Sequence, residues 1–448
     1  MLRKVCSVVG LAILLSAGSA YAQQSIQNRQ LPASALRKMK PISVHSNQAL
    51  KNFGVDKNLG TNSGIKNGAT SGIVGIDSVV NWSDQFFSPG FDGNGNPQSF
   101  WPYTMVGNPP ESGESVRIRA PIVPVKVELL GPDGSVALTF APDDKVIKAA
   151  LGSPEFVPAA FTNGVGQFND QLMRAEFANR LGRGDDGEGD EEDGWHTLLD
   201  PELRTARTIK VPFLTAQGKN AWFFFINANG QPVLGAIDFD TFGSLLFPAT
   251  FPVDNSTPVG AAELAGDITT HDISTFLLNN TVLFVNGDIN QCCVIGAHAF
   301  EFEPGIPQNG NRPRLYVLNH SSWLSPGLFL FGSADLTAWS HEMAETFNDP
   351  FVNNATPWWL SVDPLTGDTK CQNNLEVGDV IEVLHSLNPV STIPGKGLTY
   401  HPQNEAMFPW FAFESPSPAH LGAYSFPDET TLMSLSPGPL LPGCVAAP

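Results

Sequence analysis

The stretch on which the fold and the chemistry depend is SADLTAWSHEMAETFNDP, residues 333–350. Ser333 or Asp335 can cap the start of a helix, because a short polar side chain accepts hydrogen bonds from unpaired backbone N–H groups. Pro350 cannot continue a helix, since it lacks an N–H group and its ring clashes with the preceding turn. The sequence therefore predicts a helix over residues 333–348.

The predicted helix has two different faces. Its apolar residues recur at steps of three and four positions and form one stripe: Leu336, Trp339, Met343 and Phe347. His341, Glu345 and Asp349 follow one another at single-turn spacing on another side, with Glu342 beside them. One imidazole and several carboxylates therefore share a helical face.

Side chains at positions i and i+4 of a helix can bind the same tetrahedral metal ion. Zinc peptidases use two histidines in this way, in the motif HExxH, with the intervening glutamate as general base. Here Glu345 stands where the second histidine would be. A carboxylate binds zinc at a similar distance, and oxygen ligands also suit manganese or calcium. We therefore expect His341 and Glu345 to bind a metal, most simply zinc, with Glu342 as the base.

The plain alternative is an amphipathic helix whose polar side faces water. Such faces usually mix lysine with glutamate, because pairs of opposite charge at i and i+4 are favourable. Residues 315–369 contain no lysine or arginine at all. The acids of this helix therefore have no local counter-charge, which favours a bound cation.

A third ligand has to come from elsewhere in the chain. The segment LEVGD, residues 375–379, supplies Glu376 as the ligand that we expect, and Asp379 as an outer residue that orients His341. Asp349, two turns after His341, is the second choice. The remaining candidate histidines are expected to be structural: His196, His298 and His320. Of these, His298 follows a cysteine pair and is the next to test.

The cysteines indicate an oxidising compartment. Residues after the first 22 hold Cys292, Cys293, Cys371 and Cys444, an even number that predicts two disulfides. Neighbouring cysteines rarely pair with each other, so Cys292 and Cys293 are expected to bond to Cys371 and Cys444. A zinc site made of the four is the alternative, although no CxxC spacing supports it.

The first residues have the pattern of an export signal. Arg3 and Lys4 precede an apolar run over residues 8–15, and Ala20-Tyr21-Ala22 is a small-x-small cleavage site. The run is too short to span a bilayer, and no later segment is long and apolar enough. We expect a signal peptide over 1–22, no membrane span, and a secreted or periplasmic protein.

The rest of the chain predicts an α+β fold. Residues 23–75 are polar and basic, which indicates a disordered leader or a propeptide that covers an acidic site. Short β-type runs then follow at residues 99–106, 118–129, 221–227, 282–285 and 315–318, with a second helix over 166–181. We expect a β-rich lobe over residues 76–200 and a second lobe over 201–448 that carries the metal helix.

Charge excludes some partners and suggests others. The chain has a formal net charge of −19, which becomes −21 without Arg3 and Lys4 because residues 1–22 contain no acid. Such a surface repels nucleic acid, so no nucleic-acid partner is expected. Residues 185–193 carry seven acids in nine positions, as a solvated loop or a weak calcium site. Residues 92–96 begin like an EF-hand loop, but Pro97 replaces the required glycine.

Several motifs together resemble a known group of proteins. They are Cys292-Cys293, SHEMAE at 340–345, NDP at 348–350, Trp358-Trp359 and LEVGD at 375–379. This pattern resembles a family of uncharacterised secreted bacterial proteins with HExxE and EVGD motifs. It is more distantly similar to plant phosphate-induced, exordium-type proteins.

The resemblance is specific over about residues 290–382 and implies a zincin-like fold for the lobe over 201–448. The matching site positions are His341, Glu342, Glu345, Glu376 and Asp379. True zincins have a histidine at the position that Glu345 occupies here.

These observations predict a secreted metal-dependent hydrolase, a zinc metallopeptidase acting on peptide or protein substrates. The alternatives are a non-catalytic extracellular or wall-associated binding protein with a structural metal, and a calcium-stabilised β-rich adhesion module.

Overall fold

A computed structural model of the protein describes ten stretches of the chain. They are residues 26–39, 42–43, 70–71, 75–92, 95–181, 194–248, 255–330, 332–362, 369–384 and 389–435. The expected signal peptide, the acidic stretch 185–193 and Cys444 lie outside these residues. Helices and a large β-sheet make up the described part, so the expectation of a mixed fold is confirmed at that level.

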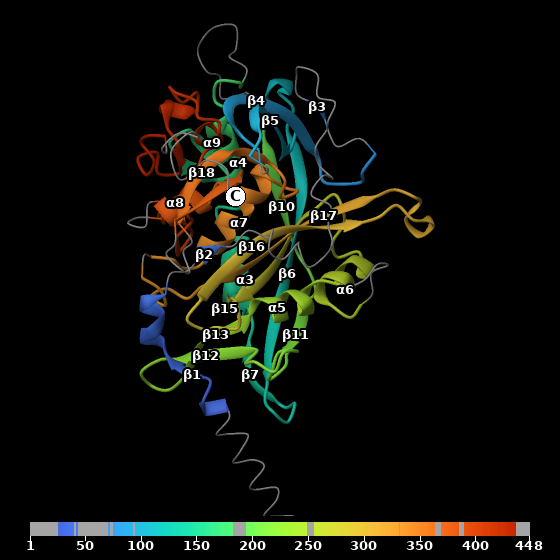
Figure 1. Ribbon diagram of the computed structural model, residues 1–448, viewed down its shortest axis with the longest axis vertical. Coiled ribbons are helices and arrows are strands. Elements are labelled where there is room, and N and C mark those ends of the chain that lie inside the picture. The colour runs from blue at the N-terminus through green and yellow to red at the C-terminus, as the bar shows by residue number, and fades with distance from the viewer. Residues whose placement is uncertain are drawn as a thin grey trace, which may run out of the picture.

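The large sheet has twelve strands within the described residues (Figure 1). Along its main path the order is β1 (Gln30–Pro32), β12 (Trp222–Ile226), β13 (Pro232–Asp238), β15 (Thr281–Phe284), β16 (Cys292–Glu303), β17 (Arg314–Trp323), β14 (Ile273–Asn279), β6 (Val116–Leu130) and β10 (Thr197–Leu203). Off this path, β2 (Ile42–Ser43) pairs with β16, while β7 (Val136–Phe140) and β11 (Arg207–Val211) pair with β6. Both parallel and antiparallel pairs occur, so the sheet is mixed.

Smaller sheets and the helices surround it. The smaller sheets contain β3 (Thr70–Ser71), β4 (Asn81–Phe91) and β5 (Pro97–Val106); β8 (Ala159–Phe161) and β9 (Gly164–Gly166); β18 (Ala355–Val362) and β19 (Thr369–Asn374); β20 (Ile393–Pro394) and β21 (Thr399–Tyr400); and β22 (Glu405–Ala406) and β23 (Ser425–Phe426). The α-helices are α3 (Asp144–Leu151), α4 (Phe168–Glu176), α5 (Phe239–Leu246), α6 (Pro258–Ala265), α7 (Thr337–Asn348), α8 (Asp379–Leu384) and α9 (Phe408–Phe411). The 3-10 turns of the described residues are η1 (Ala33–Lys38), η2 (Pro110–Ser112), η3 (Pro307–Asn309) and η4 (His420–Gly422).

The centre of the sheet is covered on both faces. Successive side chains of a strand point to opposite faces. On β17, Leu315 and Val317 pack into the core that contains α7, while Tyr316 and Leu318 pack into the core that contains α5 and α6. A strand buried on both faces needs a continuous apolar run, and this is why residues 315–318 stood out in the sequence.

The expected division between residues 200 and 201 falls inside β10. Strand β6 pairs with β10 and β11 and also with β14, so both predicted lobes contribute to one sheet. No motif marks this boundary in the sequence, because pairing between strands far apart in the chain leaves no local pattern.

Part of the stretch 23–75 is ordered. Residues 30–38 form β1 and η1 on the edge of the large sheet, where Leu36 is fully buried. Arg29 donates to the carbonyl oxygen of Trp222 and lies over the ring of Phe213. The basic composition suggested disorder here, but this arginine binds aromatic faces instead of remaining in water.

Helix α7 begins later than its sequence indicates. Neither expected cap binds the helix start, because α7 begins at Thr337 without a side-chain cap. Asp335 instead accepts hydrogen bonds from the backbone N–H groups of Leu336 and His401, and its other oxygen lies 2.6 Å from His401 Nδ1. The helix ends at Asn348, two residues before Pro350, as expected.

None of the helices in the described residues has the length and apolar character that a bilayer span requires.

Candidate metal centre

Helix α7 is buried on every side. All twelve of its residues are buried, including His341 and Glu342, whose exposed fraction is 0%. The alternative of a polar helix face in contact with water is therefore excluded. Burying ionisable groups is costly unless they are paired or bind a metal, so this face requires partners.

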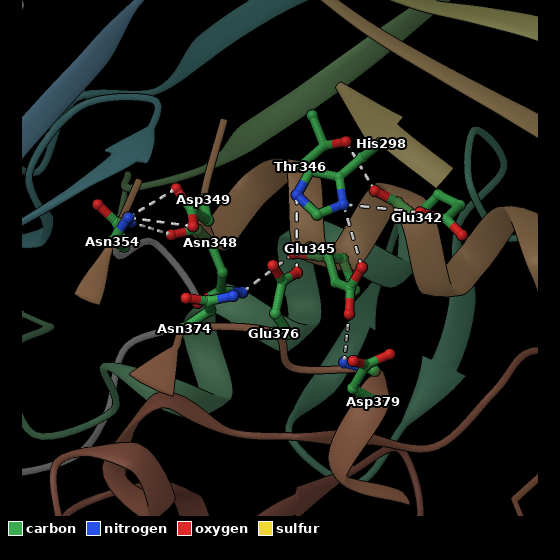
Figure 2. A network of polar contacts seen from close by, with 12 residues as sticks. His298, Glu342, Glu345, Thr346, Asn348, Asp349, Asn354, Asn374, Glu376 and Asp379 are labelled. Carbon is green, nitrogen blue, oxygen red and sulfur yellow. Dashed lines mark hydrogen bonds and ion pairs between the residues drawn. The ribbon is translucent and has the colours of Figure 1, made fainter. Parts of the chain in front are cut away.

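One group of candidate ligands gathers from three separate segments (Figure 2). His298 reaches in from β16, and its Nδ1 lies 3.1 Å from Glu345 Oε2 of α7. Its Nε2 lies 3.7 Å from Glu376 Oε2, in the segment before α8. Glu342 Oε2 is 3.6 Å from the same Nδ1. His298, Glu345 and Glu376 can thus face one ion, with Glu342 beside them.

A second group shares one member with the first. His341 Nε2 lies 3.1 Å from Glu345 Oε1 and 3.8 Å from Asp379 Oδ1. The backbone N–H of Gly378 donates to Glu345 Oε1 over 3.2 Å. The two oxygens of Glu345 therefore face different histidines.

The three ligands that the sequence predicts do not lie in one group but are distributed over the two groups. Glu345 belongs to both groups, His341 to one and Glu376 to the other. His298, expected to be structural, lies in the centre. A single histidine in the apolar run GAHAF has the pattern of a core residue, and its position after the cysteine pair was the only hint in the sequence.

Two glycines let the backbone approach these side chains. A Cβ atom on Gly378 would lie 2.3 Å from His341 Nδ1, and one on Gly296 would lie 2.6 Å from Glu342 Oε1. No real Cβ can be that close, so any other residue would displace the imidazole or the carboxylate. The glycine in LEVGD therefore belongs to the site through close packing.

Gln403 holds His341 from the side away from Glu345. Its Nε2 donates to His341 Nδ1 over 2.7 Å and to the carbonyl oxygen of Gly378 over 2.8 Å. Its backbone N–H donates to Ser340 Oγ. Glu382 Oε1 lies 3.6 Å from the same His341 Nδ1. No pattern in the sequence singles out Gln403, which lies 62 positions after His341.

Asp349, the second choice for a third ligand, belongs to neither group. Its carboxylate accepts hydrogen bonds from the backbone N–H groups of Asn353 and Asn354, which closes the turn after α7. Burial, together with the nearby charge of Glu376, raises the pKa of Asp349 to about 8. Its role in this conformation is to order the chain that follows the helix.

The charges of the centre act strongly on one another. Burial lowers the pKa of both imidazoles, but the charges of Glu376 on His298 and of Glu345 on His341 outweigh it, so both pKa values lie well above the ordinary value. Burial raises the pKa of Glu345, but the positive charge of His341 brings it below the ordinary value. Burial raises the pKa of Glu342.

The residues present fit a metal ion. Both ring nitrogens of His298, Nε2 of His341 and both carboxylate oxygens of Glu342 are buried without a hydrogen-bond partner in the described part of the chain. Buried polar atoms are seldom left in that state, since each costs about 1–3 kcal/mol. Imidazole and carboxylate are ligands of zinc and manganese, and carboxylates also bind calcium.

The cysteine pairing differs from the expectation. Cys292 and Cys293 are bonded to each other, across a cis peptide that brings their Cα atoms to 3.0 Å. The prediction that these two cysteines bond to Cys371 and Cys444 was therefore wrong. It rested on the rarity of bonds between neighbouring cysteines, whose Cα atoms lie about 3.8 Å apart across the usual trans peptide. Cys371 is disulfide-bonded as well.

A pH test follows from a carboxyl group outside the centre. Burial raises the pKa of Glu176 to about 8, although its Oε1 accepts a hydrogen bond from the N–H of Phe408. The folded state thus keeps a proton that the unfolded state loses above pH 4.5, the ordinary value for this group. This contribution to stability is complete below that pH, falls as the pH rises and is gone above about pH 8.

In Glu176→Gln, urea unfolding between pH 5 and pH 8.5 should lose this component, on the order of 4 kcal/mol. Glu114→Gln, at an exposed glutamate, is the control and should retain the slope of the wild type. Equal slopes in the wild type and Glu176→Gln would contradict the assignment.

Compared with models of known protein families, with curated proteins and with solved structures, the chain matches none. Its function is therefore inferred from the chemistry of the buried residues.

Proposed function

We propose that this protein is a secreted metal-dependent hydrolase that acts on peptide bonds. The observation that supports the proposal is the convergence of His298, Glu345 and Glu376 from three segments, with Glu342 beside them and several buried polar atoms lacking hydrogen bonds. The buried HExxE helix and the resemblance to secreted HExxE proteins agree with a zincin-like arrangement of the lobe over residues 201–448. Export is supported by the pattern of residues 1–22.

A bound divalent metal would supply Lewis acidity, which polarises a carbonyl group and lowers the pKa of a bound water. The remaining chemistry belongs to Glu342. Burial raises the pKa of this carboxyl group, so it is suited to accept a proton from water and to pass it to the leaving amine. Because Glu342 lies next to His298, its carboxylate is within reach of a water bound to the proposed metal.

Zinc is the metal that we propose, because imidazole is a good zinc ligand and carboxylates bind zinc as well. Three protein ligands also leave a fourth position for water, as in catalytic zinc sites. Manganese or calcium would be favoured if the carboxylates dominate. Metal analysis of the native protein by mass spectrometry identifies the ion directly.

A second candidate function is a non-catalytic extracellular binding protein that retains a structural metal. Burial favours it, because His298, Glu345 and Glu376 have exposed fractions of only 1%, 2% and 0%. A substrate can reach such a centre only if part of the surrounding chain moves. The two candidates therefore differ in catalysis and not in metal binding.

Glu342→Gln separates them. The variant should retain the metal content of the wild type, while cleavage of a peptide library falls by about 100- to 10,000-fold, the usual contribution of a general base. Glu155→Gln is a matched control, because Glu155 is equally buried but hydrogen-bonds to Asn169 instead of facing the centre. Cleavage by Glu342→Gln at the wild-type rate would refute the role of Glu342. If the metal-loaded wild type cleaves no peptide, the second candidate, a binding protein with a structural metal, would be favoured.

A further inference from the structure

We propose that the centre binds two metal ions, with Glu345 as the bridge between them. The second position is formed by His341, Glu345 and Asp379. The inference rests on the proposed metal centre at His298, Glu345 and Glu376, and it adds an ion that the HExxH comparison does not suggest.

The first argument is the geometry of Glu345. Its Oε2 faces His298 Nδ1 and its Oε1 faces His341 Nε2, each over 3.1 Å. Two ligands of one tetrahedral ion, each about 2.1 Å from it, lie about 3.4 Å apart. Each contact therefore has the length expected between two ligands of one ion. Since the two contacts use different oxygens, the carboxylate can bind one ion on each side.

The second argument is that the two imidazoles do not share a position. Within the described residues, no group of three or more candidate ligands within 4.8 Å of one another includes both His298 and His341. Nitrogen ligands of a single ion can be at most about 4 Å apart, even on opposite sides of it. A single ion could bind both imidazoles only after a rearrangement of the buried side chains.

The third argument is an atom without a partner. His341 is fully buried, and its Nε2 forms no hydrogen bond although it faces Glu345 and Asp379. Its other nitrogen is held by Gln403 and lies 3.6 Å from Glu382 Oε1. A histidine that binds metal through Nε2 has its proton on Nδ1, and a nearby carboxylate is the usual acceptor for it. Glu382 fits that role, once the Gln403 amide turns away.

The fourth argument is charge. Seven buried carboxyl groups lie around the two imidazoles: Glu342, Glu345, Asp349, Glu376, Asp379, Glu382 and Glu405. Each ion pair recorded for His298 and His341 is with one of these carboxylates. One divalent ion offsets two negative charges, and a second offsets two more. Pairs of ions about 3.5–4 Å apart are also an established arrangement in hydrolases, including aminopeptidases.

The test is a metal count on the full-length protein. The chain is stripped with a chelator, titrated with Mn²⁺, and its bound metal is measured by mass spectrometry after dialysis. We expect two equivalents in the wild type and one in each of His298→Ala and His341→Ala. Electron paramagnetic resonance should show magnetically coupled Mn²⁺ ions in the wild type and a single uncoupled ion in both variants.

His320→Ala is the matched control. His320 is buried on β17 and is paired with Ala297, so it points to the sheet face opposite that of His298. This variant loses a buried imidazole and should retain both ions and the coupled signal. Circular dichroism of all three variants checks that they are folded.

One equivalent in the wild type would overturn the inference while leaving the proposed function intact. Loss of all metal in both His298→Ala and His341→Ala, with folding preserved, would also overturn it, because a single ion would then be bound by both imidazoles. A wild type that binds no metal would refute the proposed function as well.

Discussion

Glu345→Ala is expected to leave the folded protein with no tightly bound metal. Glu345 is the one residue that belongs to both candidate groups, and its two oxygens face His298 and His341. Loss of an outer-sphere partner already costs about 10- to 100-fold in metal affinity, and the loss of a shared ligand should exceed this range. Mass spectrometry after dialysis against a weak chelator measures the result.

Glu155→Ala serves as the control, since it removes an equally buried glutamate that belongs to neither candidate group. Both variants should be less stable than the wild type, because truncation leaves a cavity and unpaired polar groups. Only Glu345→Ala should lose its metal. A Glu345→Ala protein that retains one equivalent would show that the ion is bound elsewhere.

Removal of the metal by a chelator should lower the free energy of unfolding of the wild type more than any other change in solution conditions. An ion that binds the folded state contributes about 4 kcal/mol when its concentration is 1,000 times its Kd. Without it, the buried carboxylates repel one another. We expect the midpoint of thermal unfolding to fall by roughly 5 °C for each ion removed by excess chelator and to recover when zinc is restored.

Glu345→Ala provides the control for that experiment, because a protein that binds no metal should respond to neither chelator nor zinc. If the wild type unfolds at the same temperature with and without chelator, no cation stabilises this cluster. Recovery with magnesium as well as with zinc would contradict an imidazole-containing site, since magnesium prefers oxygen ligands and water.

Local patterns in the sequence predicted a substantial part of the structure. The helix was expected because Trp339 and Met343 recur at helical spacing, and α7 ends where Pro350 requires. The run Leu315–Leu318 was expected to be a strand and lies in β17. In each case the information lies within a few neighbouring residues.

Other features depend on contacts between distant segments. His298 reaches Glu345 because β16 packs against α7, and a strand with one histidine has no pattern that distinguishes a ligand from a core residue. Gln403 reaches His341 from a late loop. Asp335 was expected to cap the helix, but its hydrogen bonds go to Leu336 and to His401. Which of several possible partners a polar side chain binds depends on the fold, and a single sequence does not show the outcome.

The loop that carries Gln403 has a consequence for how an ion would reach the proposed centre. Residues 389–404 are joined by hydrogen bonds from Asn404 to Pro389 and from Ser391 to Pro402, and Gln403 closes the side of the centre behind His341. An ion bound among these buried side chains should exchange slowly, because the surrounding chain has to move before the ion can leave. The metal would then be selected during folding, by whichever cation is abundant where the chain completes its folding. If the chain is exported as proposed, the place of folding would decide the ion as much as the ligands do.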